Sequence, residues 1–526
     1  MYNVITFTDT PSTDWFSRGY GAYRLASEIR NHEYTALTVD FSSSLDWKTF
    51  TTIIDRSIGE STLMVGFSVT WFPYRHKKIK NPRYVVGPKS LGLDSSIDFD
   101  PDKHPWYYKS LSYNFSQGNI EQYVSYIKSK NPNCKVVVGG AKSNEYVFEP
   151  SIDNVFIGYS ENMIIDYLDS ISNRGQRRIF NKVINYDVKA QNGKFDFNNS
   201  KTIYVDTDCI RSNEILTIEF SRGCIFNCSF CSYPHRNQDT RNFVKYKEVI
   251  RSELIDNWQK YKAYRYVITD DTFNDYTEKL ILIKEVIDTL PFKPEFWAYI
   301  RLDLVSRNPE QAQLIKDIGV KEIYYGLETW GDHTAKSIKK GGSLHKKIEG
   351  MKIAKECWGN DIYIVSGIII GLPLDNVKDI EDSVTWYINE GHAYIDLFAY
   401  TSLTLYYPDN TWEYKFHSDI ESNMAKYKYT FEDVENNPLE WTRADGGDIL
   451  NKTQADNLMV KYNKVVKNYW RDSICWNWKT VFNYDTECWN KSATDLYYAH
   501  VTNYYWPQLL EQLEKRSHGG FLSQDV

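Results

Sequence analysis

Three cysteines stand close together near the middle of the chain, and any fold must bring their thiols to one place. Cys224, Cys228 and Cys231 are separated by three and then two residues, in the segment Ser-Arg-Gly-Cys-Ile-Phe-Asn-Cys-Ser-Phe-Cys. An ordinary four-iron electron-transfer cluster takes four cysteines. Three thiolates would leave the fourth iron without a protein ligand, and open positions on metals are where chemistry takes place. The spacing therefore predicts a reactive [4Fe-4S] centre.

Two other interpretations fit these cysteines less well. A zinc site usually takes its ligands from two C-x2-C pairs, or from one such pair and a His pair. No second pair follows here at such a spacing. Cysteines can also be buried as small apolar residues, but packing alone gives no reason for three so close together.

The remaining cysteines do not add a second metal site. They are scattered through the chain at Cys134, Cys209, Cys357, Cys475 and Cys488. Eight cysteines in 526 residues do not form a disulfide scaffold. Cys475 and Cys488 alone are too few for an auxiliary cluster.

Short apolar segments alternate with helical patterns over residues 1–175. Strands are expected at residues 3–8, 34–41, 63–70, 135–140 and 154–158. A helix is expected at 20–30, because apolar residues recur there at helical spacing. Such alternation predicts a parallel, doubly wound sheet with ligands at the carboxyl ends of its strands.

Two less regular segments adjoin this first unit. Residues 71–118 interrupt it and interleave basic with aromatic side chains. Such a stretch either contacts an anionic ligand or forms a solvated loop. Residues 176–211 are polar and Asn-rich, which predicts a linker with a short hairpin.

A second alternation runs over residues 212–410. Its strands are expected at 216–220, 266–269, 296–300, 322–327, 362–370 and 395–400. Six strand–helix units predict a partial TIM-type barrel, (β/α)6, with chemistry at the carboxyl ends of the strands. Charged residues fall at those ends, namely Asp270, Asp271, Arg301 and Glu328.

The cysteine spacing, with Phe230 directly before the last cysteine, resembles the signature of the radical SAM superfamily. The resemblance implies that the free iron chelates the amino and carboxylate groups of S-adenosylmethionine (SAM). It also implies that one electron cleaves SAM to methionine and a 5′-deoxyadenosyl radical. Phe230 is then expected to lie beside the cofactor.

The same resemblance suggests further SAM contacts. Asp270 and Asp271 occupy the place of the family's turn that binds the SAM amino group, and Arg301 resembles the residue that approaches the SAM carboxylate. Glu328 resembles a ribose contact. The strand that resembles the family's adenine-packing strand supplies Ser366, Gly367, Ile369 and Gly371.

Each of these charged residues also has a structural interpretation. Asp271 would cap a helix, Arg301 would pair with Asp303, and Glu328 would form an ion pair at the barrel rim. The sequence leaves both sets of interpretations open.

The first unit resembles the cobalamin-binding-type domain that precedes many radical SAM cores. The resemblance lies mainly in the strand-end glycines Gly139 and Gly140 and in the turn at residues 158–161. The first loop, residues 9–14, lacks the D-x-H-x-x-G motif whose His would ligate cobalt. Cobalamin therefore remains an open prediction.

Residues 411–526 carry no second motif. Helices are expected at 457–470 and 505–515. In related enzymes this region closes over the barrel and selects the substrate. Aromatic residues that would line such a pocket or pack in the core are Tyr406, Tyr407, Trp412, Trp441 and Trp476.

Composition and charge bear on the partners and the cellular location of the protein. The net charge of −7 argues against a general nucleic-acid binder. No apolar run approaches the ~20 residues of a membrane span, and the N-terminus has no leader pattern. A cytoplasmic protein is expected, with a reduced ferredoxin or flavodoxin as electron donor. The 41 tyrosines and 16 tryptophans reflect either compositional bias or a cavity lined with rings.

These observations predict an α/β protein with a Rossmann-like first domain, a partial radical SAM barrel and a mainly helical C-terminal region. The predicted activity is C–H functionalisation of an unidentified substrate. Methyl transfer is expected if cobalamin binds, and rearrangement, cyclisation or oxidation if it does not. A methylthiotransferase fits less well, because the N-terminal half has only Cys134. The alternative is a non-catalytic iron–sulfur protein that retains the fold.

Overall fold

The computed structural model describes residues 1–10, 17–73, 106–172, 174, 178–185, 195–432, 439–471 and 498–517. Most of the insertion at 71–118 therefore lies outside the described residues, as do Trp476, Cys475 and Cys488. Within the described ranges, no helix combines the length and the hydropathy needed to cross a bilayer.

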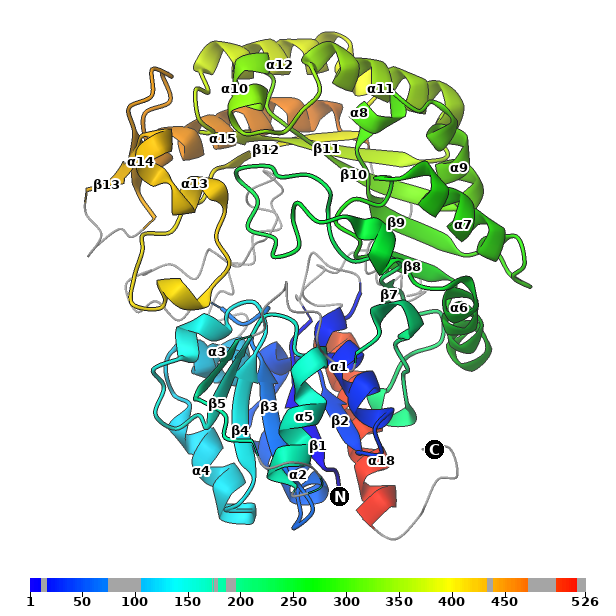
Figure 1. Cartoon of the computed structure of the whole chain (residues 1–526), viewed down its shortest axis with the longest axis vertical. Coiled ribbons are helices and arrows are strands. Elements are labelled where there is room, and N and C mark those ends of the chain that lie inside the picture. Colours follow the sequence, from blue (N-terminus) through cyan, green and yellow to red (C-terminus); the bar gives the residue numbers. More distant parts are fainter. Residues whose placement is uncertain are drawn as a thin grey trace.

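The first unit is a parallel sheet of six strands in the order β2-β1-β3-β4-β5-β6 (Figure 1). Its strands are β1 (Val4–Phe7), β2 (Ala36–Val39), β3 (Met64–Ser68), β4 (Lys135–Gly139), β5 (Asn154–Ile157) and β6 (Val183–Asn185). Nearly every residue of the first five strands is buried, because helices cover both faces of the sheet. The strand order reverses direction at β1, where doubly wound sheets bind ligands.

Two separate apolar clusters fill the two sides of this sheet. On one side lie α1 (Tyr20–Arg30) and α5 (Glu161–Ile171). On the other side lie α2 (Trp47–Ser57), α3 (Leu111–Ser116) and α4 (Glu121–Lys130).

One strand of the first sheet has no counterpart among the predicted strands. β6 lies within residues 176–211, where the polar composition indicates a linker, and it pairs with β5 in parallel. Only Ile184 of its three residues is fully buried, so an edge strand of this kind carries little apolar signal.

The second unit is also a parallel six-stranded sheet, in the order β12-β11-β10-β9-β8-β7. Its strands are β7 (Leu216–Ile218), β8 (Arg265–Ile268), β9 (Glu295–Tyr299), β10 (Val320–Glu328), β11 (Tyr363–Ile370) and β12 (Leu397–Ser402). The helices between them are α6 (Lys247–Tyr261), α7 (Thr277–Ile287), α8 (Leu302–Val305), α9 (Glu310–Ile318), α10 (Asp332–Ser337), α11 (Leu344–Trp358) and α12 (Val377–Asn389). β7 and β12 form the two edges, so the barrel is open.

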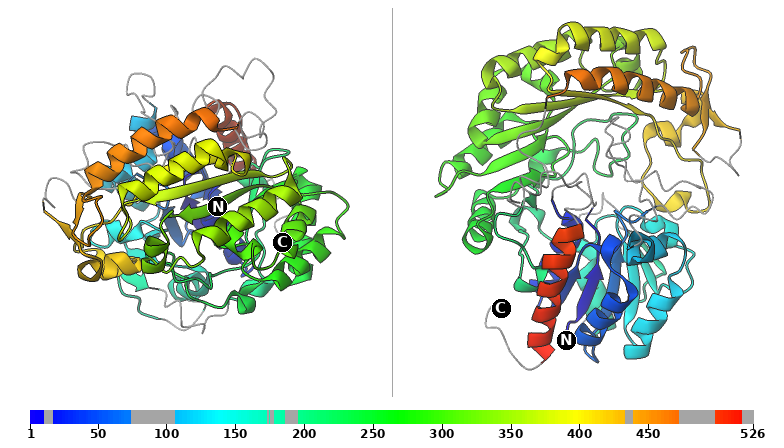
Figure 2. Two further views of the ribbon diagram at one scale, coloured as in Figure 1. Left: turned by 90° about the horizontal axis from the view of Figure 1, so that it is seen from above. Right: turned by 180° about the vertical axis from the view of Figure 1, so that it is seen from behind.

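The C-terminal region contributes to both units. α13 (Asp419–Ser422), α14 (Met424–Tyr427) and the hairpin β13 (Tyr429–Phe431)–β14 (Trp441–Arg443) follow the barrel. α15 (Lys452–Val466) packs on β12 and β11, whereas α18 (Trp506–Ser517) crosses to the first unit and packs on α2 (Figure 2). The predicted α/β class, with a Rossmann-like sheet followed by a partial barrel, is confirmed.

Candidate functional site

The carboxyl ends of both sheets open into one chamber of about 1410 Å³. The first sheet contributes strand-end residues such as Ser68, Gly140 and Gly158, and the second contributes Thr217, Asp271 and Tyr299. Cys231 and Phe230 line the same chamber. The ligand-binding ends of two parallel sheets therefore share a single cavity.

The cysteine loop, residues 219–239, follows β7 and is held by backbone hydrogen bonds. Cys224 N–H donates to the carbonyl of His235 (3.1 Å), and Cys231 N–H donates to the carbonyl of Cys228 (3.1 Å). Gly223 enters the loop at φ +111°, a conformation that an L side chain rarely adopts, and a Cβ there would lie 3.3 Å from Thr240. The backbone thus holds the three thiols in a compact loop.

The thiol environment suits a cationic metal centre. Burial, together with the nearby Asp271, Cys228 and Cys224, raises the pKa of Cys231 to about 11, although the Tyr233 N–H partly opposes this. Burial also raises the pKa of Cys224. Three crowded thiolates are stabilised only when positive charge lies between them, and a metal centre supplies that charge.

A single metal ion needs ligands that converge on one point, whereas cluster thiolates bind separate irons and need no common point. In the described ranges, no group of three His, Cys, Asp or Glu side chains converges on a position for a single metal ion.

Asp270 and Asp271 have different environments. Asp270 accepts hydrogen bonds from the N–H of Phe220 (2.8 Å) and the hydroxyl of Ser221 (2.5 Å), and Lys279 lies 3.6 Å away. Asp270 therefore anchors the start of the cysteine loop. Asp271 lines the chamber, and its buried Oδ2 atom has no hydrogen-bond partner among the described residues.

Asp271 is the carboxylate available to a ligand. Its pKa is raised well above the usual range by burial, although the Tyr233 hydroxyl partly opposes this. Asp271 does not cap the helix that follows, because α7 begins only at Thr277. A cationic partner would compensate the buried charge.

Arg301 is paired with Asp303, as its structural interpretation predicts. Its Nε and Nη2 atoms donate to the carboxylate at 3.0 and 2.7 Å, and Nη2 also donates to the carbonyl of Lys340 (2.6 Å). The guanidinium lies 3.8 Å from the ring centroid of Phe226 in the cysteine loop. Arg301 thus stabilises the cysteine loop through its contact with Phe226.

Glu328 forms the predicted rim ion pair, and its partner is a residue that the sequence reasoning missed. Glu328 adopts φ +68°, and its Oε1 lies 3.3 Å from Nζ of Lys340. That ammonium also lies 6.0 Å from the ring centroid of Phe230. The only sequence signal for Lys340 is that it precedes Gly341-Gly342.

The four residues predicted on the adenine-packing strand lie in the barrel wall: Ser366, Gly367 and Ile369 on β11, and Gly371 directly after it. The hydroxyl of Ser366 donates to the carbonyl of Tyr325 (2.8 Å), and Gly371 packs against the indole of Trp441. Gly367 faces the Tyr324 hydroxyl, and Ile369 is half-buried. None of the four is among the described residues that line the chamber.

The aromatic residues predicted in the C-terminal region lie partly on the chamber wall and partly in the core. Tyr406 and Tyr407 line the chamber, whereas Trp441 is fully buried and donates to the carbonyl of Leu403 (2.9 Å). Core packing therefore accounts for Trp441.

Arg222 connects the cysteine loop to the first sheet. Its guanidinium pairs with Glu219 (2.9 Å) and with Glu161 at the start of α5 (3.0 Å), and it lies 4.3 Å from the ring centroid of Tyr159. The hydroxyls of Tyr159 and Tyr233 are 3.0 Å apart. Sequence reasoning noted Glu161 but missed Arg222, although it stands two residues before Cys224.

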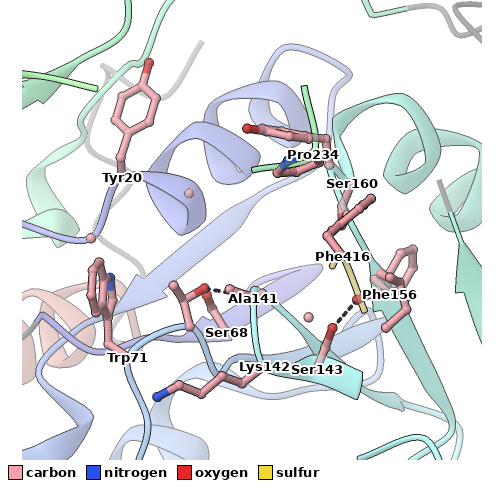
Figure 3. A pocket seen from close by; sticks show the side chains of 18 of the residues that line it. Tyr20, Ser68, Trp71, Ala141, Lys142, Ser143, Phe156, Ser160, Pro234 and Phe416 are labelled. Atoms are coloured by element: carbon pink, nitrogen blue, oxygen red, sulfur yellow. Dashed lines mark hydrogen bonds between the residues drawn. The ribbon is translucent and has the colours of Figure 1, made fainter. Parts of the chain in front are cut away.

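The first-sheet end of the chamber offers hydroxyls and closely packed glycines. Ser68, Ser143 and Ser160 surround it together with Lys142, and the Ser143 hydroxyl donates to the carbonyl of Phe156 (Figure 3). Gly140 adopts φ +96°, and a Cβ there would lie 2.5 Å from the hydroxyl of Thr70. No histidine is among the described residues that line the chamber.

Comparisons with known proteins agree with this architecture. A family model described as the radical SAM superfamily matches residues 218–387. A putative methylthiotransferase of Methanocaldococcus jannaschii is 26% identical over 285 residues, which cover 50% of this chain and 59% of that protein. The match thus spans about three fifths of that relative's length. A bacteriochlorophyllide d C-8(2)-methyltransferase of Chlorobaculum tepidum is 22% identical, over 63% of this chain and 70% of the relative.

A solved structure shares the arrangement of the whole chain. The radical SAM methyltransferase TsrM from Kitasatospora setae, with cobalamin and a [4Fe-4S] cluster bound, superposes with a TM-score of 0.61. The superposition covers 98% of this chain and 100% of TsrM, at 12% identity. At that identity the likeness concerns the fold.

Proposed function

We propose that this chain, whose residues 218–387 match the radical SAM family model, cleaves SAM reductively and functionalises a C–H bond of a substrate held in the chamber. The supporting observation is that Cys231 and the strand ends of the first sheet line one cavity. A reagent produced at the thiols would therefore reach whatever binds above the first sheet without entering bulk solvent.

The three thiols would hold a [4Fe-4S] cluster, which with SAM supplies an electron and a 5′-deoxyadenosyl radical. Asp271 would accept a hydrogen bond from the SAM amino group, and this cationic partner would return its carboxyl to the ionised form. Lys340 would attract the SAM carboxylate from beside Phe230. Arg301, engaged with Asp303, would hold Phe226 and the loop in place.

The chamber also supports cobalamin as a second group, which would supply a carrier for a methyl group. Its volume exceeds the roughly 300–1,000 Å³ of an ordinary small-molecule pocket. Gly140 packs directly against Thr70, and the serines around it provide polar contacts. Methyl transfer to carbon is the proposed outcome.

The proposed setting follows from the chemistry of the centre. A cluster with an open iron is oxygen-sensitive, so a reducing, cytoplasmic environment suits it. A reduced ferredoxin or flavodoxin is the proposed one-electron donor.

Anaerobic turnover tests the proposal. The full chain, reconstituted with iron and sulfide, is reduced in the presence of SAM, and 5′-deoxyadenosine is quantified. Cys228→Ala should abolish its release, whereas Cys357→Ala should not, because Cys357 lies on α11 away from the loop. No release from a fully reconstituted cluster would favour the non-catalytic iron–sulfur alternative.

Cobalamin is tested separately. The chain is mixed with hydroxocobalamin and desalted, and its absorption spectrum is recorded. A retained corrin band supports the second cofactor. Loss of the band on desalting would exclude cobalamin as a cofactor. The reaction would then be a rearrangement, a cyclisation or an oxidation.

A further inference from the structure

One lysine on the chamber wall has no counter-ion. Lys415 follows η10 (Trp412–Tyr414) and lines the chamber. Its ammonium lies 4.3 Å from the ring centroid of Tyr406 and 5.0 Å from that of Trp412. It forms no ion pair and donates no hydrogen bond to any described residue.

The other cations around the chamber have partners. Arg18 pairs with Glu214 (2.6 Å), and Arg222 pairs with two glutamates, as described above. Lys142 donates to the carbonyl of Phe72, and Arg24 donates to that of Lys201. Arg24 still has two buried guanidinium nitrogens, Nε and Nη2, without a partner among the described residues. Among the described cations of the chamber lining, Lys415 is the one whose charged group makes neither an ion pair nor a hydrogen bond.

The carboxylates nearest to Lys415 are held by other groups. Glu421 accepts from the N–H and the hydroxyl of Ser418, both at 3.0 Å, and Asp409 accepts from Thr411 at 2.8 and 2.7 Å. Burial lowers the pKa of Lys415, while Glu421, Asp409 and Glu145 partly restore it. A half-buried ammonium with incomplete compensation is stabilised when an anion arrives.

The segment that carries Lys415 is fixed on both sides of the chamber. The Asn144 amide donates to the hydroxyl of Thr411 (3.0 Å), which joins the segment to the loop after β4. Arg236, in the cysteine loop, donates to the carbonyl of His417 (2.9 Å), and the His417 ring stacks on Trp412 at 3.5 Å. The ammonium is thus positioned between the two cofactor-binding ends, where little reorganisation is needed on binding.

We propose that Lys415 binds an anionic group of the substrate, a carboxylate or a phosphate. The rings of Tyr406 and Tyr407, which line the same wall, would contact the apolar part of that substrate. This inference rests on the proposed function, because it takes the chamber as the reaction site. It names the substrate class that the chamber selects.

Binding of simple probes tests the inference without turnover. Phenyl phosphate, benzoate and the neutral benzyl alcohol are titrated calorimetrically into the anaerobically reconstituted full chain. At least one anion should bind tenfold or more tightly than benzyl alcohol. Phenyl phosphate binding more tightly indicates a phosphate substrate, and benzoate binding more tightly indicates a carboxylate.

Variants of Lys415 test whether the anionic probes bind at this residue. Lys415→Met should weaken anion binding at least tenfold, and Lys415→Arg should retain it. Lys461→Met is the control, because Lys461 lies 4.7 Å from the Tyr462 ring on the exposed face of α15 and should have no effect. Circular dichroism of each variant confirms folding, and Lys415→Gln replaces Lys415→Met if that variant does not fold.

Two results would overturn the inference: unchanged anion binding in the Lys415 variant, or no preference of the wild type for the anions. Failure of the proposed function is a different observation, namely no 5′-deoxyadenosine from the wild type with SAM and reductant. Each idea can therefore fail while the other stands.

Discussion

The Nη2 atom of Arg222 lies 3.0 Å from Oε1 of Glu161, and this ion pair joins the cysteine loop to the first sheet. Each side chain is only 8% exposed. Burial raises the pKa of Glu161, but Arg222 and Arg24 outweigh it, so the net direction is downward. Because Arg222 stands two residues before Cys224, the pair couples the position of the thiols to the Rossmann-like sheet.

Glu161→Gln should loosen that coupling. Arg222 keeps Glu219 but loses one charged partner in a buried site, so the free energy of unfolding should fall by roughly 1–3 kcal/mol. Denaturant unfolding of the full chain measures this. Glu285→Gln is the control, because it removes the exposed pair with Lys247 and should change stability by less than about 1 kcal/mol. Equal effects of both variants would argue against the coupling.

Sequence reasoning predicted the features whose signals are local. The cysteine spacing and the strands that end at Asp270 and Glu328 can be identified within a few residues. The barrel strands also have apolar runs long enough to stand out, and every predicted strand is found within a few residues of its expected ends.

The residues that were missed depend on distant contacts. Glu161 and Arg222 are 61 positions apart, and the Tyr505 hydroxyl accepts from the N–H of Asp40 across 465 positions. Lys415 contacts Tyr406 and Trp412, which are close to it in sequence, yet nothing in that stretch shows that the nearby Asp409 and Glu421 are held by Thr411 and Ser418. Such positions can be recognised only once the chain is folded.

The two neighbouring aspartates should respond differently to amidation. Asp271→Asn should weaken SAM binding and 5′-deoxyadenosine release at least tenfold with little loss of stability, because its Oδ2 makes no internal hydrogen bond in the described chain. Asp270→Asn should instead destabilise the fold by roughly 1–3 kcal/mol, since it anchors Phe220 and Ser221. SAM titration and thermal unfolding of both variants separate the roles. Reversed outcomes would assign the ligand contact to Asp270.

The buried carboxyl of Asp375 should make the free energy of unfolding depend on pH. Burial raises its pKa to about 7, although Gly371 N–H and Arg443 oppose this, and its Oδ1 is buried without a partner among the described residues. The carboxyl has a higher pKa in the folded than in the unfolded chain. The contribution of Asp375 to the free energy of unfolding is therefore fully present below the pKa of the unfolded chain, 3.8, and is lost as the pH rises toward 7.

Asp375→Asn should remove that pH dependence. The variant should be more stable than the wild type at pH 8, by at most about 4 kcal/mol, and the difference should shrink as the pH falls toward 4. Asp382→Asn, on the exposed face of α12, should show no such trend. Unfolding free energies measured between pH 4.5 and pH 8 provide the comparison. A constant difference at all pH values would contradict the assignment.

Gly140 should tolerate no side chain, and its substitution should affect the cofactor end of the chamber. A Cβ at Gly140 would lie 2.5 Å from the Thr70 hydroxyl and 2.9 Å from the Thr70 nitrogen, at a φ of +96°. Gly140→Ala should therefore cost about 1 kcal/mol or more and should reduce the corrin band retained after desalting. Gly359→Ala is the control, because Gly359 also has a positive φ (+56°) but ends α11 outside the chamber lining, and its Cβ would meet nothing within 4 Å. The control should also cost about 1 kcal/mol of stability but should leave the corrin band unchanged. A full corrin band in Gly140→Ala would show that the loop after β4 does not form the cofactor site.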